Sequence, residues 1–144
     1  DRIVKVSSSM MGDSWMGSHI TNDDLVKQTQ LYKHYSCESR TEVSGNYIIA
    51  IKPRPSAPVV WGKIIMTVRK ADNIPVKIEY FSEKSVLKRT MSFHNVKKMD
   101  GRLVPCRMVI TPAGKSEYTE IIYDKIRFNV QIPSRYFSLR GLKR

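Results

Sequence analysis

The stretch KIIMTVR, residues 63–69, decides the fold because apolar side chains recur there at every second position. In an extended strand this spacing places Ile64 and the other apolar residues on one face and polar ones on the other. The same alternation recurs in Val76–Phe81, Leu87–Val96 and Leu103–Thr111. One apolar face and one wet, basic face are typical of an antiparallel sheet. We therefore expect a mainly β fold, built as an antiparallel meander.

Turn residues separate further strands on both sides of this stretch. Ser44-Gly45-Asn46 predicts a tight hairpin, whereas Pro53–Pro58 predicts an extended loop because proline gives no ladder N–H. A short strand is also expected at Ile3–Val6, and a short helix or tail at Ser134–Leu142. The other expected strands are Lys33–Val43, Tyr47–Ile51, Val60–Arg69, Val76–Phe81, Leu87–Val96, Leu103–Thr111 and Tyr118–Phe128.

One helix is expected ahead of these strands, from Asn22 to about Gln30. The Thr21 hydroxyl suits the N-cap position, and Asp23 and Asp24 then fall in the first turn, where the helix dipole favours negative charge. The residues before the cap include large apolar side chains that something must cover. We expect this segment to be a short lid packed against the sheet. Its apolar members are Trp15, Met16 and Ile20.

The apolar face of the expected sheet has little to cover it, since the chain offers only one short helix and a tail. Three arrangements would solve this: the sheet curls into a barrel, further residues complete it, or a ligand fills its concavity. The 144 residues are enough for one domain, 1–144. The chain starts at Asp1 in a strand-like sequence, so we expect a fragment of a longer protein.

The net charge of +12 predicts attraction to nucleic acid, anionic lipid headgroups or an acidic protein, although solvated strand faces explain it equally well. Nucleic-acid binding would usually bring aromatic residues onto the basic face for base stacking. Most tyrosines and phenylalanines here alternate with the basic residues instead, with Trp61 and Phe81 as exceptions. We therefore expect no nucleic-acid partner. No apolar run reaches the length of about 18 residues that a transmembrane helix needs.

No catalytic motif is recognisable in the sequence, so we expect no enzyme and no cofactor. The three histidines are scattered, and Cys37 and Cys106 lack the spacing of a zinc site, so no metal is expected. Whether these two cysteines pair remains open. The methionines of the apolar face suit either an adaptable pocket or an ordinary core. They are Met66, Met91 and Met108.

Several short motifs resemble those of the outer membrane lipoprotein-sorting family, the LolA-like proteins of bacterial envelopes. Trp15-Met16-Gly17-Ser18 followed by Thr21–Leu25 resembles an aromatic-Met-Gly-small block before an acidic helix start. Pro55 and Pro58 before Trp61-Gly62-Lys63 resemble a loop-to-strand step, and Gly101–Pro105 a late hairpin. Phe137-Ser138-Leu139, with Leu142-Lys143-Arg144, resembles the closing segment. His19 and Ile20 depart from the pattern, which has an acidic and an aromatic residue there.

The resemblance corresponds to the C-terminal part of the family's domain and implies a half-open, incomplete β-barrel with a helical lid. It also implies a non-catalytic carrier in the periplasm that holds lipid acyl chains or lipoproteins in an apolar concavity, for transfer to the outer membrane. The residues expected to line that concavity or its lid are Trp15, Met16, Ile20, Ile64, Met66, Ile78, Tyr80, Met91, Phe93 and Met108.

Partners implied by the resemblance are an inner-membrane transporter or an outer-membrane acceptor protein. The basic outer face and the Arg135–Arg144 tail would suit peripheral contact with an anionic membrane. Two alternatives remain open. One is an envelope-stress regulatory or protein-interaction domain on the same fold, as in RseB-like proteins. The other is a nucleic-acid-binding β-domain.

Overall fold

The computed structural model describes residues 6–27, 30–138 and 140–141. Parts of three expected elements therefore lie outside the described residues. They are the strand expected from Ile3, two residues of the expected helix, and most of the closing segment. Every helix in the described ranges falls short of the length and apolarity that crossing a membrane requires.

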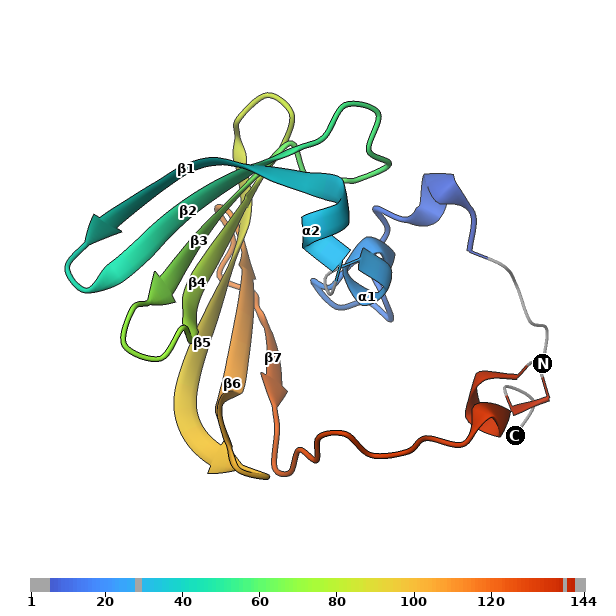
Figure 1. The fold of residues 1–144 in the computed structure, drawn as a ribbon. Helices are drawn as coiled ribbons and strands as arrows, with labels where there is room; N and C mark the ends of the chain where they lie inside the picture. Colours follow the sequence, from blue (N-terminus) through green and yellow to red (C-terminus); the bar gives the residue numbers. More distant parts are fainter. Residues whose placement is uncertain (1–5, 28–29, 139, 142–144) are drawn as a thin grey trace.

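The described chain forms one seven-stranded antiparallel sheet in which each strand pairs with its neighbour in sequence (Figure 1). The sheet is curled but open, and β1 and β7 form its two edges. This confirms the expected meander and the incomplete barrel. The strands are β1 (Tyr35–Val43), β2 (Asn46–Pro53), β3 (Lys63–Arg69), β4 (Pro75–Phe81), β5 (Leu87–Met99), β6 (Arg102–Pro112) and β7 (Thr119–Ile122).

Among the described residues, four short helical elements accompany the sheet, and two of them, α1 and α2, lie over one of its faces (Figure 1). We call that face the lid side. Figure 1 shows α1 and α2 beside the upper part of the strands, whereas the lower parts of β5, β6 and β7 extend past them. The elements are η1 (Ser8–Met10), α1 (Asn22–Lys27), α2 (Leu31–His34) and η3 (Ser134–Phe137).

The core lies between the lid side of the sheet and the helices. In the sheet register, Ile51 faces Ile64 and Ile64 faces Tyr80, so these side chains form one row across β2, β3 and β4. Ile20, from the segment before α1, and Tyr35, at the start of β1, bury this row. The alternation seen in the sequence therefore identifies the core face correctly, because burying one face of a sheet fixes its register.

Several boundaries differ from the expected ones; β3, for example, begins at Lys63 and not at Val60. The strand expected from Lys33 begins only at Tyr35, because Leu31–His34 forms the helix α2, in which Leu31 packs against the core. β5 continues to Met99, well past the expected end. β7 is only four residues long: after Ile122 the chain leaves the sheet, and the Phe128 N–H is held by the Asp100 carboxylate at 2.7 Å.

The segment before α1 is a compact turn that returns the chain to the sheet. Ser14 and Thr21 form an isolated antiparallel bridge, and the Trp15 N–H donates to the Ile20 carbonyl at 2.7 Å. Met16 and Gly17 both have positive φ at the tip of this turn. Gly17 tolerates that conformation freely, whereas Met16 adopts it because the bridge closes the turn. We call residues 14–27 the lid.

Candidate functional site

The lid is fastened to the sheet by a buried ion pair. Arg89 lies on the lid side of β5 and is only 4% exposed. Its Nη1 and Nη2 donate to the two carboxylate oxygens of Asp24 at 2.7 and 2.6 Å. Nη1 also donates to the His19 carbonyl at 2.9 Å. A guanidinium fork matches a carboxylate in this way and fixes orientation as well as charge.

Asp24 also caps the helix on which it lies. Its Oδ2 accepts the Thr21 backbone N–H at 2.8 Å, while the Thr21 hydroxyl accepts the Asp24 N–H at 3.2 Å. These reciprocal bonds are a capping box and confirm the expected N-cap. Burial by itself raises the pKa of Asp24, but Arg89 and Thr21 together hold that pKa below its usual value. Asp24 is therefore charged at neutral pH, and it anchors the lid through Arg89 in addition to capping the helix.

Two aromatic rings enclose the Arg89 guanidinium. Its Cζ lies 4.6 Å from the centroid of the Trp61 ring and 4.2 Å from that of Tyr80, so both rings contribute cation–π contacts. Burial raises the pKa of Tyr80 to about 12, although the Arg89 charge opposes the shift. Trp61 precedes β3 and packs against the core. The expectation that it shares the basic face is therefore wrong, since Trp61 lies outside the strand and does not follow its alternation.

A second link joins the lid to the edge strand β7. The His19 backbone N–H donates to the Thr119 hydroxyl oxygen at 2.9 Å, and the His19 Nδ1 lies 3.0 Å from the same atom. Thr119 begins β7, one hundred residues further along the chain. The lid is thus fixed to β5 and to β7.

The residues expected at the ligand site fall into three groups by exposure. Five are buried where the lid packs against the sheet, three are partly buried on the lid side, and two are exposed at the turn. The exposed pair are Trp15, at 40%, and Met16, at 83%. The partly buried residues are Met66, Phe93 and Met108. The buried residues are Ile20, Ile64, Ile78, Tyr80 and Met91.

One pocket beside α2 is lined by both apolar and polar residues. It has a volume of about 390 Å³ and includes Leu31, Tyr35, Ile51 and Met66 in its lining. Of the residues expected at the ligand site, Met66 reaches this pocket. Ile64 and Tyr80 line only a space of about 20 Å³ under the lid, which is too small for a ligand.

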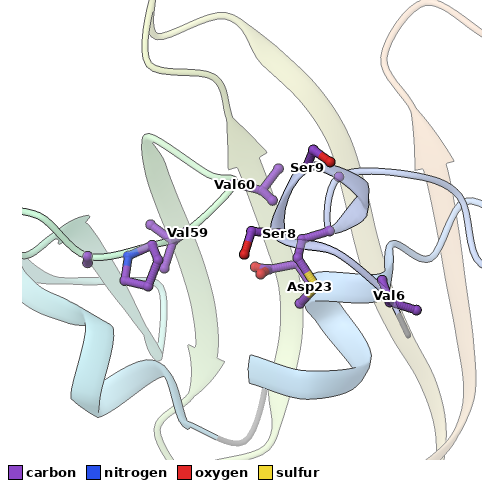
Figure 2. A pocket seen from close by; sticks show the side chains of 10 residues that line it. Val6, Ser8, Ser9, Asp23, Val59 and Val60 are labelled. Carbon is purple, nitrogen blue, oxygen red and sulfur yellow. The ribbon is translucent and has the colours of Figure 1, made fainter. Parts of the chain in front are cut away.

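A pocket of about 580 Å³ lies between the N-terminal segment and the loop before β3. Figure 2 shows Val59 and Val60 on the loop side, Ser8 on the side of η1, and Asp23 projecting from α1 between them. A third pocket, of about 280 Å³, lies where the lid meets β5 and is lined by Trp61 and Arg89 among others. Neither pocket was expected from the sequence, because each is formed by segments distant in the chain.

The described residues offer neither a metal-type cluster nor a paired cysteine. Within the described ranges, no cluster of three or more histidine, cysteine or acidic side chains could hold a metal ion. Cys37 on β1 and Cys106 on β6 are both free thiols, one exposed and one buried. The sheet register separates them by four strands, which leaves them too far apart for a disulfide.

Sequence reasoning missed Arg89, although its signal was present. In β5 the apolar positions Leu87, Met91 and Phe93 share one face, and Arg89 falls on that same face by simple alternation. A charged residue at a core position is unusual unless it is paired. A basic residue at this position could therefore have predicted a buried acidic partner. The sequence pattern does not say which acidic residue is that partner.

The open meander with helices over its apolar face defines a LolA-like fold. A family model described as "Uncharacterized protein" matches residues 1–144, and the chain belongs to that family. A search among curated proteins finds no match.

Three solved structures are similar to this chain. A DUF1329 family protein from Desulfovibrio piger has a TM-score of 0.82 at 22% identity, over 94% of this chain and 58% of its own. An outer membrane lipoprotein-sorting protein domain from Vibrio parahaemolyticus has a TM-score of 0.82 at 23% identity, over 99% and 62%. A LolA superfamily protein from Nitrosomonas europaea has a TM-score of 0.66 at 18% identity, over 89% and 59%. The chain thus spans about three fifths of each protein, and the likeness is one of fold.

Proposed function

We propose that this chain is a non-catalytic binding domain of the bacterial periplasm that holds acyl chains of lipids or lipoproteins on the lid side of its sheet. The observation that carries the proposal is the incomplete cover of this apolar face. Phe93, Met108 and Ile121 lie opposite one another across β5, β6 and β7 and are only partly buried. Figure 1 shows the lower parts of these strands extending past α1 and α2.

An acyl chain suits this surface chemically. Methionine side chains adapt to flexible ligands, and each buried methylene contributes about 0.8 kcal/mol. The pocket beside α2 continues the same face through Met66, which pairs with Ile78 in the sheet register. The Vibrio parahaemolyticus domain is described as a lipoprotein-sorting domain. By analogy, we propose that this chain delivers lipoproteins to the outer membrane. The donor and acceptor would then be an inner-membrane transporter and an outer-membrane protein.

Fluorescence titration with parinaric acid methyl ester, an uncharged acyl probe, tests the proposal. Met108→Glu places a charge on the lid side, so it should weaken binding by about tenfold or more, which is at least about 1.4 kcal/mol. Val109→Glu is the matched control, because Val109 is the next residue of β6, faces the opposite side and is also partly buried. We expect it to bind the probe like the unmodified chain.

Absence of saturable binding to the unmodified chain would overturn the acyl-binding proposal. Equal loss in both variants would show that the probe does not use the lid side. Co-purification of one protein that survives delipidation would instead favour the alternative of a regulatory, protein-interaction domain.

A further inference from the structure

The pocket between the lid and β5, which we call the junction pocket, has a strongly positive lining. Lys88, Arg89 and Lys115 line it together with His19, and no acidic residue does. Asp24, which neutralises Arg89, is not part of this lining. Within the described part of the chain, Lys88 and Lys115 have no ion-pair partner. Positive charge gathered in a concavity attracts anions.

Two residues that line the junction pocket each carry a buried donor without a hydrogen-bond partner among the described residues. The donors are the Nε of Arg89 and the Nε1 of Trp61. Buried N–H groups are almost always satisfied, by protein, by ordered water or by a ligand. Both donors add to the positive potential of the wall, and neither is offset by a carboxylate of the pocket lining.

Contacts within the fold hold several residues of the junction pocket in place. Arg89 is fixed by Asp24 and enclosed by aromatic rings, while His19 is fixed by Thr119. Lys88 and Lys115 lie near paired strand ends, where the Ala113 N–H donates to the Lys88 carbonyl at 2.8 Å. The backbone that carries these residues is therefore held around a space of about 280 Å³, close to the lower limit of small-ligand sites.

We propose that the junction pocket binds a phosphate group, with the ammonium groups of Lys88 and Lys115 contacting its oxygens and the Arg89–Asp24 pair fixing the wall behind them. Neither the description of the family nor the descriptions of the similar structures name a site here. The phosphate could belong to a free ion or to a lipid headgroup. A headgroup would place the polar end of a lipid at the lid while its chains occupy the lid side of the sheet. The anion site itself does not depend on acyl binding.

The test follows the indole N–H resonance of Trp61 by NMR. This resonance is the indole signal that remains in the Trp15→Phe variant. Inorganic phosphate is titrated at constant ionic strength, followed by dihexanoyl phosphatidic acid and dihexanoyl phosphatidylcholine below their micellar concentrations. We expect a saturable shift. The double variant Lys88→Gln/Lys115→Gln should weaken it by about tenfold for each ammonium removed. The matched control Lys97→Gln/Lys98→Gln removes the same charge from exposed positions near the β5–β6 turn and should leave the affinity within twofold.

The ligands distinguish the two sources of phosphate. Equal affinity for inorganic phosphate and phosphatidic acid assigns a free oxyanion, whereas much tighter binding of phosphatidic acid assigns a headgroup; either supports the site. No saturable shift with any phosphate ligand, or equal weakening in both double variants, would overturn it. The neutral parinaric ester should bind the Lys88→Gln/Lys115→Gln variant normally, so failure of the anion site and failure of acyl binding give different results.

Discussion

Asp24 and Arg89 join the lid to the sheet through two hydrogen bonds of 2.7 and 2.6 Å, between residues 65 positions apart in the chain. Removing one member of a buried pair leaves an uncompensated charge, which is far more harmful than losing both. Arg89→Met should therefore lower the free energy of unfolding by about 3–5 kcal/mol, measured by urea denaturation.

A double-mutant cycle with Asp24→Asn, which keeps a capping side chain, should give a coupling of about 1–3 kcal/mol. Lys70→Met provides the comparison, because Lys70 forms an exposed ion pair with Glu42. Its effect should stay within about 0.5 kcal/mol. Additive effects of Arg89→Met and Asp24→Asn would contradict a coupled pair.

The lowered pKa of Asp24 predicts acid sensitivity. A carboxyl group whose pKa is lower in the folded state stabilises the fold above its unfolded pKa, and that stability is lost as pH falls. For Asp24 the loss should begin near pH 5 and continue below 3.8, the ordinary pKa of an aspartate side chain. In Asp24→Asn the unfolding free energy should fall less steeply across this range. Asp72→Asn should change the slope much less, because the Arg69–Asp72 pair is more exposed and better screened.

The buried phenol of Tyr80 predicts that the fold loses stability at high pH. Because burial raises its pKa from 10.0 to about 12, the unfolded chain loses this proton first. Stability contributed by the neutral phenol is present below pH 10 and is lost between pH 10 and about 12. Tyr80→Phe should flatten the unfolding free energy across that window, whereas Tyr136→Phe, at an exposed tyrosine, should not. An unchanged alkaline slope in Tyr80→Phe would contradict the buried neutral phenol.

Gly62 is expected to be intolerant of substitution although it lies in a loop. A Cβ at this position would lie 2.4 Å from the Glu83 Cα and 2.6 Å from the Glu83 N. Backbone atoms cannot move aside cheaply, so Gly62→Ala should destabilise the fold by about 1–3 kcal/mol in thermal or urea unfolding. Gly12→Ala is the control, because a Cβ there meets no atom within 4 Å. A stable Gly62→Ala variant would mean that the two loops do not touch.

The sheet could be predicted from the sequence because period-2 alternation is a local property. Turn residues such as Ser44-Gly45 separate β1 from β2, and the buried Ile64, Tyr80 and Ile110 all fall on the expected face. α2 could not be predicted in this way, because Leu31–His34 is too short for helical periodicity and depends on tertiary packing.

The candidate site was much less accessible to sequence reasoning. Met16 was expected to cover the concavity, yet its positive φ places it at the exposed tip of a turn. The junction pocket brings together His19, Trp61, Lys88 and Lys115, which lie in separate segments. These residues come together only in the folded chain, so no local sequence pattern could predict that they lie close to one another.

The meander also has a consequence for how the chain folds. Since each strand pairs only with its sequence neighbours, the sheet can grow hairpin by hairpin with small loop-closure entropy at every step. The contacts from Asp24 to Arg89 and from His19 to Thr119 instead close loops of 65 and 100 residues. Lid docking should therefore be the late, slow event of folding, and a sheet with an undocked lid the intermediate that precedes it.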